Sequence, residues 1–154
     1  MIEPIHLTVD VACAAAHAFT IWTARTSQWW PVSHTVSTQP GLQVVFEPRQ
    51  GGRIFEQTPS GDHFDWGEIL VWDPPRRLVY SWHLRADRAD ATVVDVTFAD
   101  QGDDRTRVDI VHRGWERLGA AGQARREGNL AGWGGLLPHF IEATQDRGLL
   151  ASLG

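Results

Sequence analysis

One long amphipathic helix in the last third of the chain limits most strongly what the rest can fold into. Its apolar stripe follows the helical spacing i, i+3, i+7, i+10 and i+14, in the order Leu130, Trp133, Leu137, Phe140 and Thr144. The helix begins near Leu118 or only after Gly128, and Pro138 predicts a kink in it. A stripe of this length has to be covered by another layer of structure.

The segments before this helix alternate in polarity, which is typical of half-buried strands. Residues 5–11 form the first such strand, and helical spacing follows over residues 12–22, with a shorter helical turn up to Trp30. Six further strands are expected at residues 43–47, 53–57, 63–72, 78–84, 92–98 and 106–112, separated by turns rich in glycine and proline. This order predicts an α+β fold in which a curved antiparallel sheet packs against the long helix.

Strand periodicity also predicts which side chains face the helix. The more apolar set on the last three strands comprises Leu78, Tyr80, Trp82, Leu84, Val94, Val96, Phe98, Val108, Ile110 and His112. The strand at 63–72 is ambiguous, because Trp66 and Ile69 fall on opposite faces of a regular strand. A β-bulge at Gly67 reconciles the two.

Composition and charge exclude several classes of protein. The 154 residues suit one domain, 1–154, and the net charge of −5 does not provide the basic surface that nucleic acids require. No apolar run is long enough for a membrane span, no secretory signal is recognisable, and the single cysteine, Cys13, allows no internal disulfide. We therefore expect a cytoplasmic protein. Eight tryptophans indicate either a bulky core or an aromatic cavity.

Several short motifs, in their order and spacing from Ile5 to Thr144, resemble those of the START-like (SRPBCC) superfamily. The motifs are Trp29-Trp30-Pro31, Gly51-Gly52 before Arg53, Trp66-Gly67-Glu68-Ile69, Asp73-Pro74-Pro75 through Trp82, Thr106-Arg107-Val108, His112-Arg113-Gly114-Trp115-Glu116 and Gly132-Trp133. The branch that they resemble most is that of bacterial proteins similar to activators of the heat-shock-protein-90 ATPase. The resemblance implies a helix-grip fold, with a seven-stranded antiparallel sheet around a long C-terminal helix and two short helices after the first strand. It also implies an apolar cavity, which relatives use for lipids, sterols, polyketides or plant hormones.

The predicted ligand-binding residues are those expected to face the space between sheet and helix. They are Trp66, Tyr80, Trp82, Val96, Phe98, Ile110, His112, Trp133, Leu137 and Phe140. For each tryptophan, plain core packing is the alternative interpretation. For His112 the alternative is a buried ring satisfied by a neighbouring group, and this is the interpretation that we favour.

Candidates for catalysis or metal binding are few. His112, Asp65 and Glu56 could transfer a proton if they converge, but cross-strand ion pairs at the surface explain Asp65 and Glu56 equally well. His63 and Asp65 share a strand face, yet two ligands do not make a metal site. No phosphate-binding loop or nucleophile elbow is recognisable. We expect no metal and no cofactor.

The sequence therefore predicts a protein that binds a small apolar molecule without catalysing a reaction. The first alternative is an enzyme similar to polyketide cyclases or aromatases, with His112 and Asp65 or Glu56 as acid and base. The second is a module that binds a chaperone, as the branch name suggests. We rank it last because the chain has no second domain for another contact surface. A monomer and a homodimer both stay open.

Overall fold

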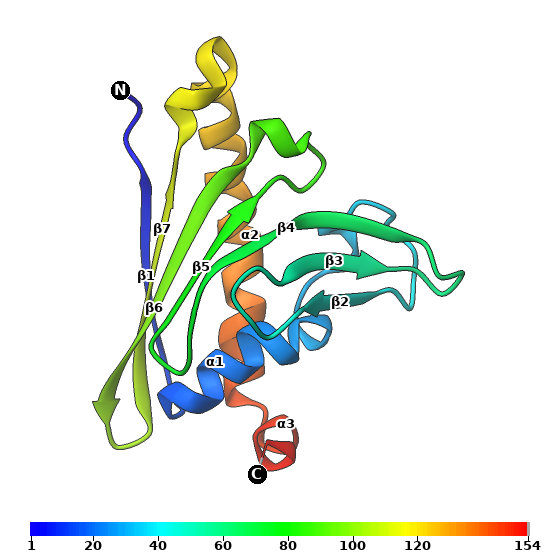
Figure 1. The fold of residues 1–154 in the computed structure, drawn as a ribbon. Coiled ribbons are helices and arrows are strands. Elements are labelled where there is room, and N and C mark those ends of the chain that lie inside the picture. The colour runs from blue at the N-terminus through cyan, green and yellow to red at the C-terminus, as the bar shows by residue number, and fades with distance from the viewer. Residues whose placement is uncertain (154) are drawn as a thin grey trace.

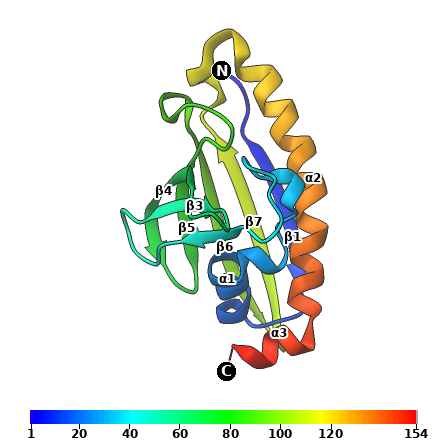
Figure 2. The same cartoon turned by 90° about the vertical axis from the view of Figure 1, so that its right-hand side faces the viewer.

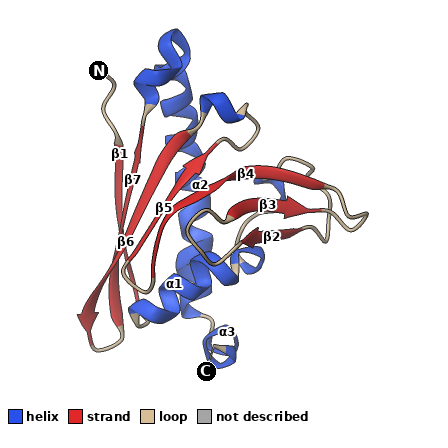
Figure 3. Cartoon of the chain, in the orientation of Figure 1, coloured by secondary structure: helices blue, strands red, loops and turns tan. Residues whose placement is uncertain are grey.

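The computed structural model describes residues 1–153, and its centre is a seven-stranded antiparallel sheet (Figures 1 and 3). The strands lie in the order β1-β7-β6-β5-β4-β3-β2. Their bounds are Ile5–Val11 for β1, Gln43–Phe46 for β2, Arg53–Gln57 for β3, His63–Asp73 for β4, Arg77–Trp82 for β5, Thr92–Gly102 for β6 and Arg105–Arg113 for β7. In Figure 1 the strands of the β2–β4 part run across those of the β1–β7 edge, so the sheet is strongly curved.

Helices cover the concave face of this sheet. Those in contact with the sheet are α1 (Ala15–Ala24) and α2 (Gly122–Gln145), and α3 (Arg147–Ser152) packs against α2. Short 3-10 helices lie at Thr26–Gln28, Val32–His34, Arg88–Asp90 and Trp115–Ala121. Figure 2 shows α2 running along the sheet as one layer. The predicted helix-grip α+β fold is therefore confirmed. Within residues 1–153, no helix combines the length and the apolar character that crossing a membrane requires.

The long helix differs in detail from the sequence prediction. It begins at Gly122, between the two expected starting points, after a 3-10 segment that contains a non-helical residue at Gly119. Pro138 lies inside this single helix, and the kink expected there stays a prediction. Proline leaves the carbonyl of residue 134 without its usual partner, and Gly134 is exposed, so water can satisfy that carbonyl.

Two β-bulges place the apolar side chains of β4 on the same side. Trp66 is the extra residue of one bulge and Leu70 of the other, so Trp66 and Ile69 are both buried while Leu70 is exposed. At Gly67 an added Cβ would lie 1.8 Å from the carbonyl oxygen of Ser81. The predicted bulge next to Gly67 is confirmed, and glycine is required there by the close approach of two strands.

The core between sheet and helices is largely aromatic. The inward-facing sets predicted on β6 and β7 are buried, including His112. Trp22 of α1 lies at the centre of the core, with its ring centroid 4.9 Å from that of Phe140 and 6.2 Å from that of Phe98. Trp29 continues the cluster, at 5.2 Å from Phe140. Edge-to-face contacts of this kind are the favoured geometry for buried aromatic rings.

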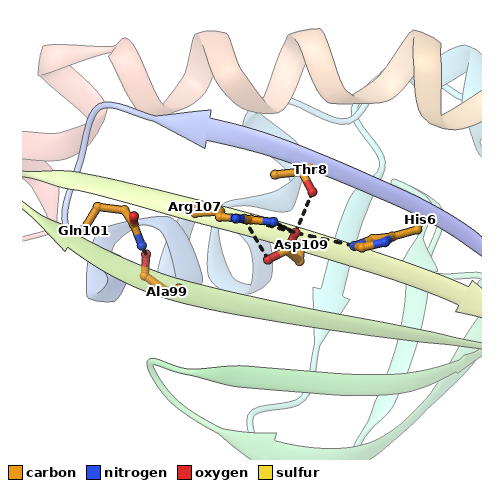
Figure 4. Close-up of polar contacts among 6 residues, drawn as sticks. All are labelled: His6, Thr8, Ala99, Gln101, Arg107 and Asp109. Carbon is orange, nitrogen blue, oxygen red and sulfur yellow. Dashed lines mark hydrogen bonds and ion pairs between the residues drawn. The ribbon is translucent and has the colours of Figure 1, made fainter.

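The outer face of the sheet is polar. In Figure 4, Asp109 of β7 accepts a hydrogen bond from the Thr8 hydroxyl at 2.5 Å, forms an ion pair with Arg107 at 3.2 Å, and lies 3.5 Å from Nε2 of His6. The hydrogen bond from Thr8, together with the charge of Arg107, holds the pKa of the Asp109 carboxyl below its usual value. The polar groups of this cluster satisfy one another at the surface, which leaves the opposite, concave face as the place for a binding site.

Candidate ligand-binding cavity

A cavity of about 340 Å³ lies between the first half of α2 and the segments that follow α1 and β5. We call it the α2 cavity. Its lining comprises Trp30, Ser33, His34, Trp82, Leu84, Arg85, Gly128, Asn129, Gly132, Trp133 and Leu136. This volume lies at the lower end of the range of pockets that hold small molecules, and the mixture of aromatic walls and a few polar groups is typical of them.

The helix side of the α2 cavity contains two glycines one turn apart. Gly128 and Gly132 are at positions i and i+4, so they face the same way. A Cβ added to either would meet no atom within 4 Å. The bare helix backbone therefore extends for about 6 Å along the wall, from the 1.5 Å rise per residue. The cavity exists partly because α2 has no side chains at these two positions.

The opposite side is built from indole rings. Trp30 and Trp82 lie 5.7 Å apart between ring centroids, and both pack against Trp66, at 5.0 Å and 5.6 Å. The indole N–H of Trp30 donates to the His34 carbonyl at 2.9 Å. These contacts hold the rings of Trp30 and Trp82 in fixed positions at the edge of the cavity.

Arg85 holds one side of the loop formed by residues 31–38, which covers the cavity. Its guanidinium donates to the carbonyl of Thr35 at 2.6 and 2.8 Å and to that of Ser33 at 2.9 Å. Arg85 itself has a φ of 60°, in the left-handed region that non-glycine residues adopt at a cost of about 1 kcal/mol or more. The three hydrogen bonds offset this cost and tie the end of β5 to the loop.

Glu56 of β3 holds the same loop from its other side. Its buried carboxylate accepts hydrogen bonds from the backbone N–H groups of Val36 at 2.6 Å and Ser37 at 2.9 Å, and from the indole of Trp66 at 2.8 Å. Burial alone raises the pKa of this carboxyl, but the hydrogen bonds from Ser37, Val36 and Trp66 outweigh it, and the net pKa is lowered. Glu56 is thus an ionised anchor whose oxygens are occupied.

His112 is fully enclosed and hydrogen-bonded at both ring nitrogens. Its Nδ1 accepts from the indole N–H of Trp133 at 3.0 Å, so Nε2 carries the proton that is directed at the Thr92 hydroxyl, 2.7 Å away. Burial, and to a smaller extent the charge of Arg125, lowers its pKa to about 3. The ring is neutral at physiological pH, and it orients the indole of Trp133 that lines the cavity.

The structure does not bring the three proposed proton-transfer residues together. Asp65 is exposed on β4 and pairs with Arg53 at 2.6 Å, whereas Glu56 and His112 are bound to the separate partners described above. His63, considered beside Asp65 as a metal ligand, stacks on the ring of Phe55 at 4.6 Å. None of these four side chains lines the α2 cavity.

Of the ligand-binding residues predicted from the sequence, Trp82 and Trp133 line the α2 cavity. The others are buried in the core: Trp66, Tyr80, Val96, Phe98, Ile110, His112, Leu137 and Phe140. Leu84 belongs to the inward-facing set predicted from the sequence, and Trp30 and Gly132 stood there as parts of motifs, but none of the three was chosen as a ligand-binding residue. Sequence reasoning did not single out His34, Arg85, Asn129 or Gly128. The spacing of Gly128 and Gly132 within the helical pattern was a usable signal. The loop residues carried no such signal in the sequence, because long-range hydrogen bonds with Arg85 and Glu56 place them.

The family model described as activator of Hsp90 ATPase homolog 1-like protein matches residues 12–144. The chain belongs to this family. The resemblance to the START-like superfamily is thereby confirmed, and a comparison with curated proteins finds no match.

Several solved proteins have the same fold as this chain, and their names differ in the function they state. The anthrahydroquino-gamma-pyrone synthase Txn09 is 34% identical, with a TM-score of 0.58 over 80% of this chain and 84% of that one. The self-sacrificing resistance protein CalC from Micromonospora echinospora is 27% identical, with a TM-score of 0.68 over 92% and 94%. An HSP90 activator from Plasmodium falciparum is 17% identical, with a TM-score of 0.53 over 72% of both chains, and this likeness concerns the fold alone.

Proposed function

We propose that this protein binds a small, flat and mostly apolar molecule in the α2 cavity. The observation that carries the proposal is the combination of a bare glycine face at Gly128 and Gly132 with fixed indole rings at Trp30 and Trp82. A flat ring system can contact helix backbone on one side and aromatic rings on the other. Burying its surface would contribute about 25 cal/mol per Å² of apolar area.

The second candidate function is a ring-closing enzyme. It is favoured by the 34% identity to a protein described as a synthase, and by the presence of an imidazole, that of His34, in the α2 cavity. A cyclisation requires groups that move protons within reach of the substrate. In this candidate His34 replaces His112, Asp65 and Glu56 as the group to test.

The experiment that tests binding is native mass spectrometry of the purified protein before and after extraction with organic solvent. We expect a defined small molecule that leaves with the solvent and can be identified in the extract. A thermal-shift screen against flat aromatic and lipophilic compounds then gives a ligand that can be handled. A bare mass together with no thermal stabilisation by any compound would contradict the proposal.

A substitution that fills the cavity locates the binding. Gly132→Leu places a side chain in the open space, and Gly134→Leu is the matched control, because Gly134 is exposed on the same helix and an added Cβ there also meets no atom within 4 Å. We expect Gly132→Leu to abolish ligand retention and Gly134→Leu to keep it, with both variants folded by circular dichroism. Equal retention in the two variants would place the ligand elsewhere.

A further inference from the structure

His34 presents a free imidazole to the α2 cavity. Its Cε1 and Nε2 atoms lie 3.5 and 3.7 Å from the position that a Cβ on Gly135 would occupy, so the ring rests against α2 where the helix has no side chain. Its backbone is fully engaged, since its N–H donates to Pro31 at 3.0 Å and its carbonyl accepts from Trp30. Within residues 1–153 neither ring nitrogen has a hydrogen bond or an ion pair.

The segment that carries His34 is held on both sides of the residue. Arg85 binds the carbonyls immediately before and after it, those of Ser33 and Thr35, and Glu56 binds the backbone further along the loop. Six hydrogen bonds to the side chains of Trp30, Glu56 and Arg85, which lie outside the loop, therefore fix it. A functional group on such a preorganised support keeps its geometry without the entropic cost of ordering a mobile loop.

Two other polar side chains of the cavity are already occupied. The guanidinium of Arg85 is committed to two backbone carbonyls, and the amide nitrogen of Asn129 donates to the carbonyl of Arg125 at 2.9 Å. The imidazole of His34 differs from both, because it is unpaired and because imidazole is the side chain that most readily gains or loses a proton near neutral pH. Ser33 also lines the cavity, but a serine hydroxyl does not gain or lose a proton near neutral pH, so the imidazole is the group at this end that can exchange one.

We propose that His34 is the residue that recognises and exchanges a proton with the ligand, and that the ligand is a flat aromatic molecule bearing a phenolic or enolic hydroxyl at this end. In the exchange the ligand O–H bond breaks, its electron pair stays on oxygen, and the proton forms an N–H bond on the imidazole. Arg85 and Glu56 are positioning residues that act through the loop. This inference rests on the binding function proposed above and names its ligand class.

The test compares two probes that differ by one hydroxyl, 2-hydroxyanthraquinone and anthraquinone, in the same dilute cosolvent. Binding is measured by quenching of tryptophan fluorescence, and ionisation of the hydroxylated probe is followed in its visible absorption band. We expect the wild-type protein to bind the hydroxylated probe about tenfold more tightly, which corresponds to about 1.4 kcal/mol. We also expect its absorption band to shift toward that of the ionised form.

His34→Gln is expected to remove both the preference and the band shift, while anthraquinone binds as before. His139→Gln is the matched control, because His139 is exposed on α2 and does not line the α2 cavity. Arg85→Met tests positioning: the band shift should shrink although His34 is intact. A His34→Gln variant that keeps the preference and the shift would overturn the inference and leave the binding function standing. Failure of the wild-type protein to bind either probe at the site blocked by Gly132→Leu would count against both.

Discussion

The two ends of α2 meet the rest of the molecule in different ways. Toward its C-terminus, Phe140 is packed between Trp22 at 4.9 Å and Trp29 at 5.2 Å, and it is fully buried. Toward its N-terminus, Gly128 and Gly132 face open space. One helix thus serves as core at one end and as cavity wall at the other, and the size of its inward-facing side chains decides which.

Trp133 joins the two ends. Its ring centroid lies 6.0 Å from that of Trp22 in the packed core, and the residue also lines the α2 cavity. Its indole N–H is held by His112, which fixes the ring against the sheet. The cavity is therefore bounded by a closely packed core, so changes at the packed end should affect stability and changes at the open end should affect binding.

Phe140→Ala, at the packed end of α2, should cause the largest loss of stability. We expect it to lower the free energy of unfolding by about 3–5 kcal/mol, because it removes a buried ring and leaves a cavity that its neighbours cannot fill. Urea denaturation measures this, with Leu130→Ala as the control, since Leu130 is 38% exposed on the same helix and its change should stay within about 0.5 kcal/mol. A loss below about 1 kcal/mol for Phe140→Ala would show that the core there is loosely packed.

The buried His112, which holds the indole of Trp133 between the two ends of α2, should make the stability of the protein depend on pH. The folded pKa of about 3 lies below the 6.5 of an ordinary histidine, so the unfolded chain takes up the proton first, and stability falls as pH drops below about 6.5. This linkage costs about 2 kcal/mol at about pH 5, at 1.36 kcal/mol per unit. We expect His112→Asn to remove that dependence while lowering stability at neutral pH. Denaturation curves at several pH values check it, and parallel profiles for the two proteins would refute it.

Alanine substitutions at the glycines of α2 test whether the space in front of the open end is empty. Gly132→Ala and Gly134→Ala should each stabilise the protein by about 1 kcal/mol, because alanine is the better helix former and its Cβ meets no atom. Gly122→Ala should destabilise it, since a Cβ there would lie 2.3 Å from the carbonyl oxygen of Trp115. Thermal unfolding measures all three. Destabilisation by Gly132→Ala would mean that the space in front of it is filled.

Substitutions on the outer face of the sheet should change the stability of the protein least. Thr8→Ala removes the hydrogen bond to Asp109, and because the cluster is largely exposed we expect a loss of only about 0.5 kcal/mol. The pKa of Asp109 should rise toward its ordinary value, since the bond from Thr8 is the largest cause of its lowering. NMR titration of the carboxyl checks this. An unchanged pKa would assign the lowering to Arg107 instead.

Strand and helix patterns were sufficient to predict most of the architecture. Alternation placed Val96, Ile110 and His112 on the inner face, and all three are buried. The conflict between Trp66 and Ile69 even indicated a bulge, which the pairing of β4 contains. These features are local consequences of a period of two along a strand, so they can be derived without knowing the partner strands.

The cavity could not be located in this way. Periodicity distinguishes inside from outside, and it assigned Phe98, Trp82 and Phe140 alike to the space between sheet and helix. Whether an inward side chain meets another side chain or empty space depends on contacts between segments far apart in the chain. Arg85 and Thr35, for instance, are 50 residues apart and joined by hydrogen bonds.

The sequence by itself therefore determined the α+β architecture of a sheet against one long helix, the inner face of the sheet and the burial of His112, because each follows from the spacing of apolar residues along the chain. The helix-grip fold itself came from the resemblance of its motifs to those of a known superfamily. Tertiary structure alone decided which partners satisfy His112, that Glu56 anchors a loop, and that His34 lies free in a cavity. The physical reason is that a polar side chain acquires its role from the partners that surround it. Those partners are brought together only when the chain folds.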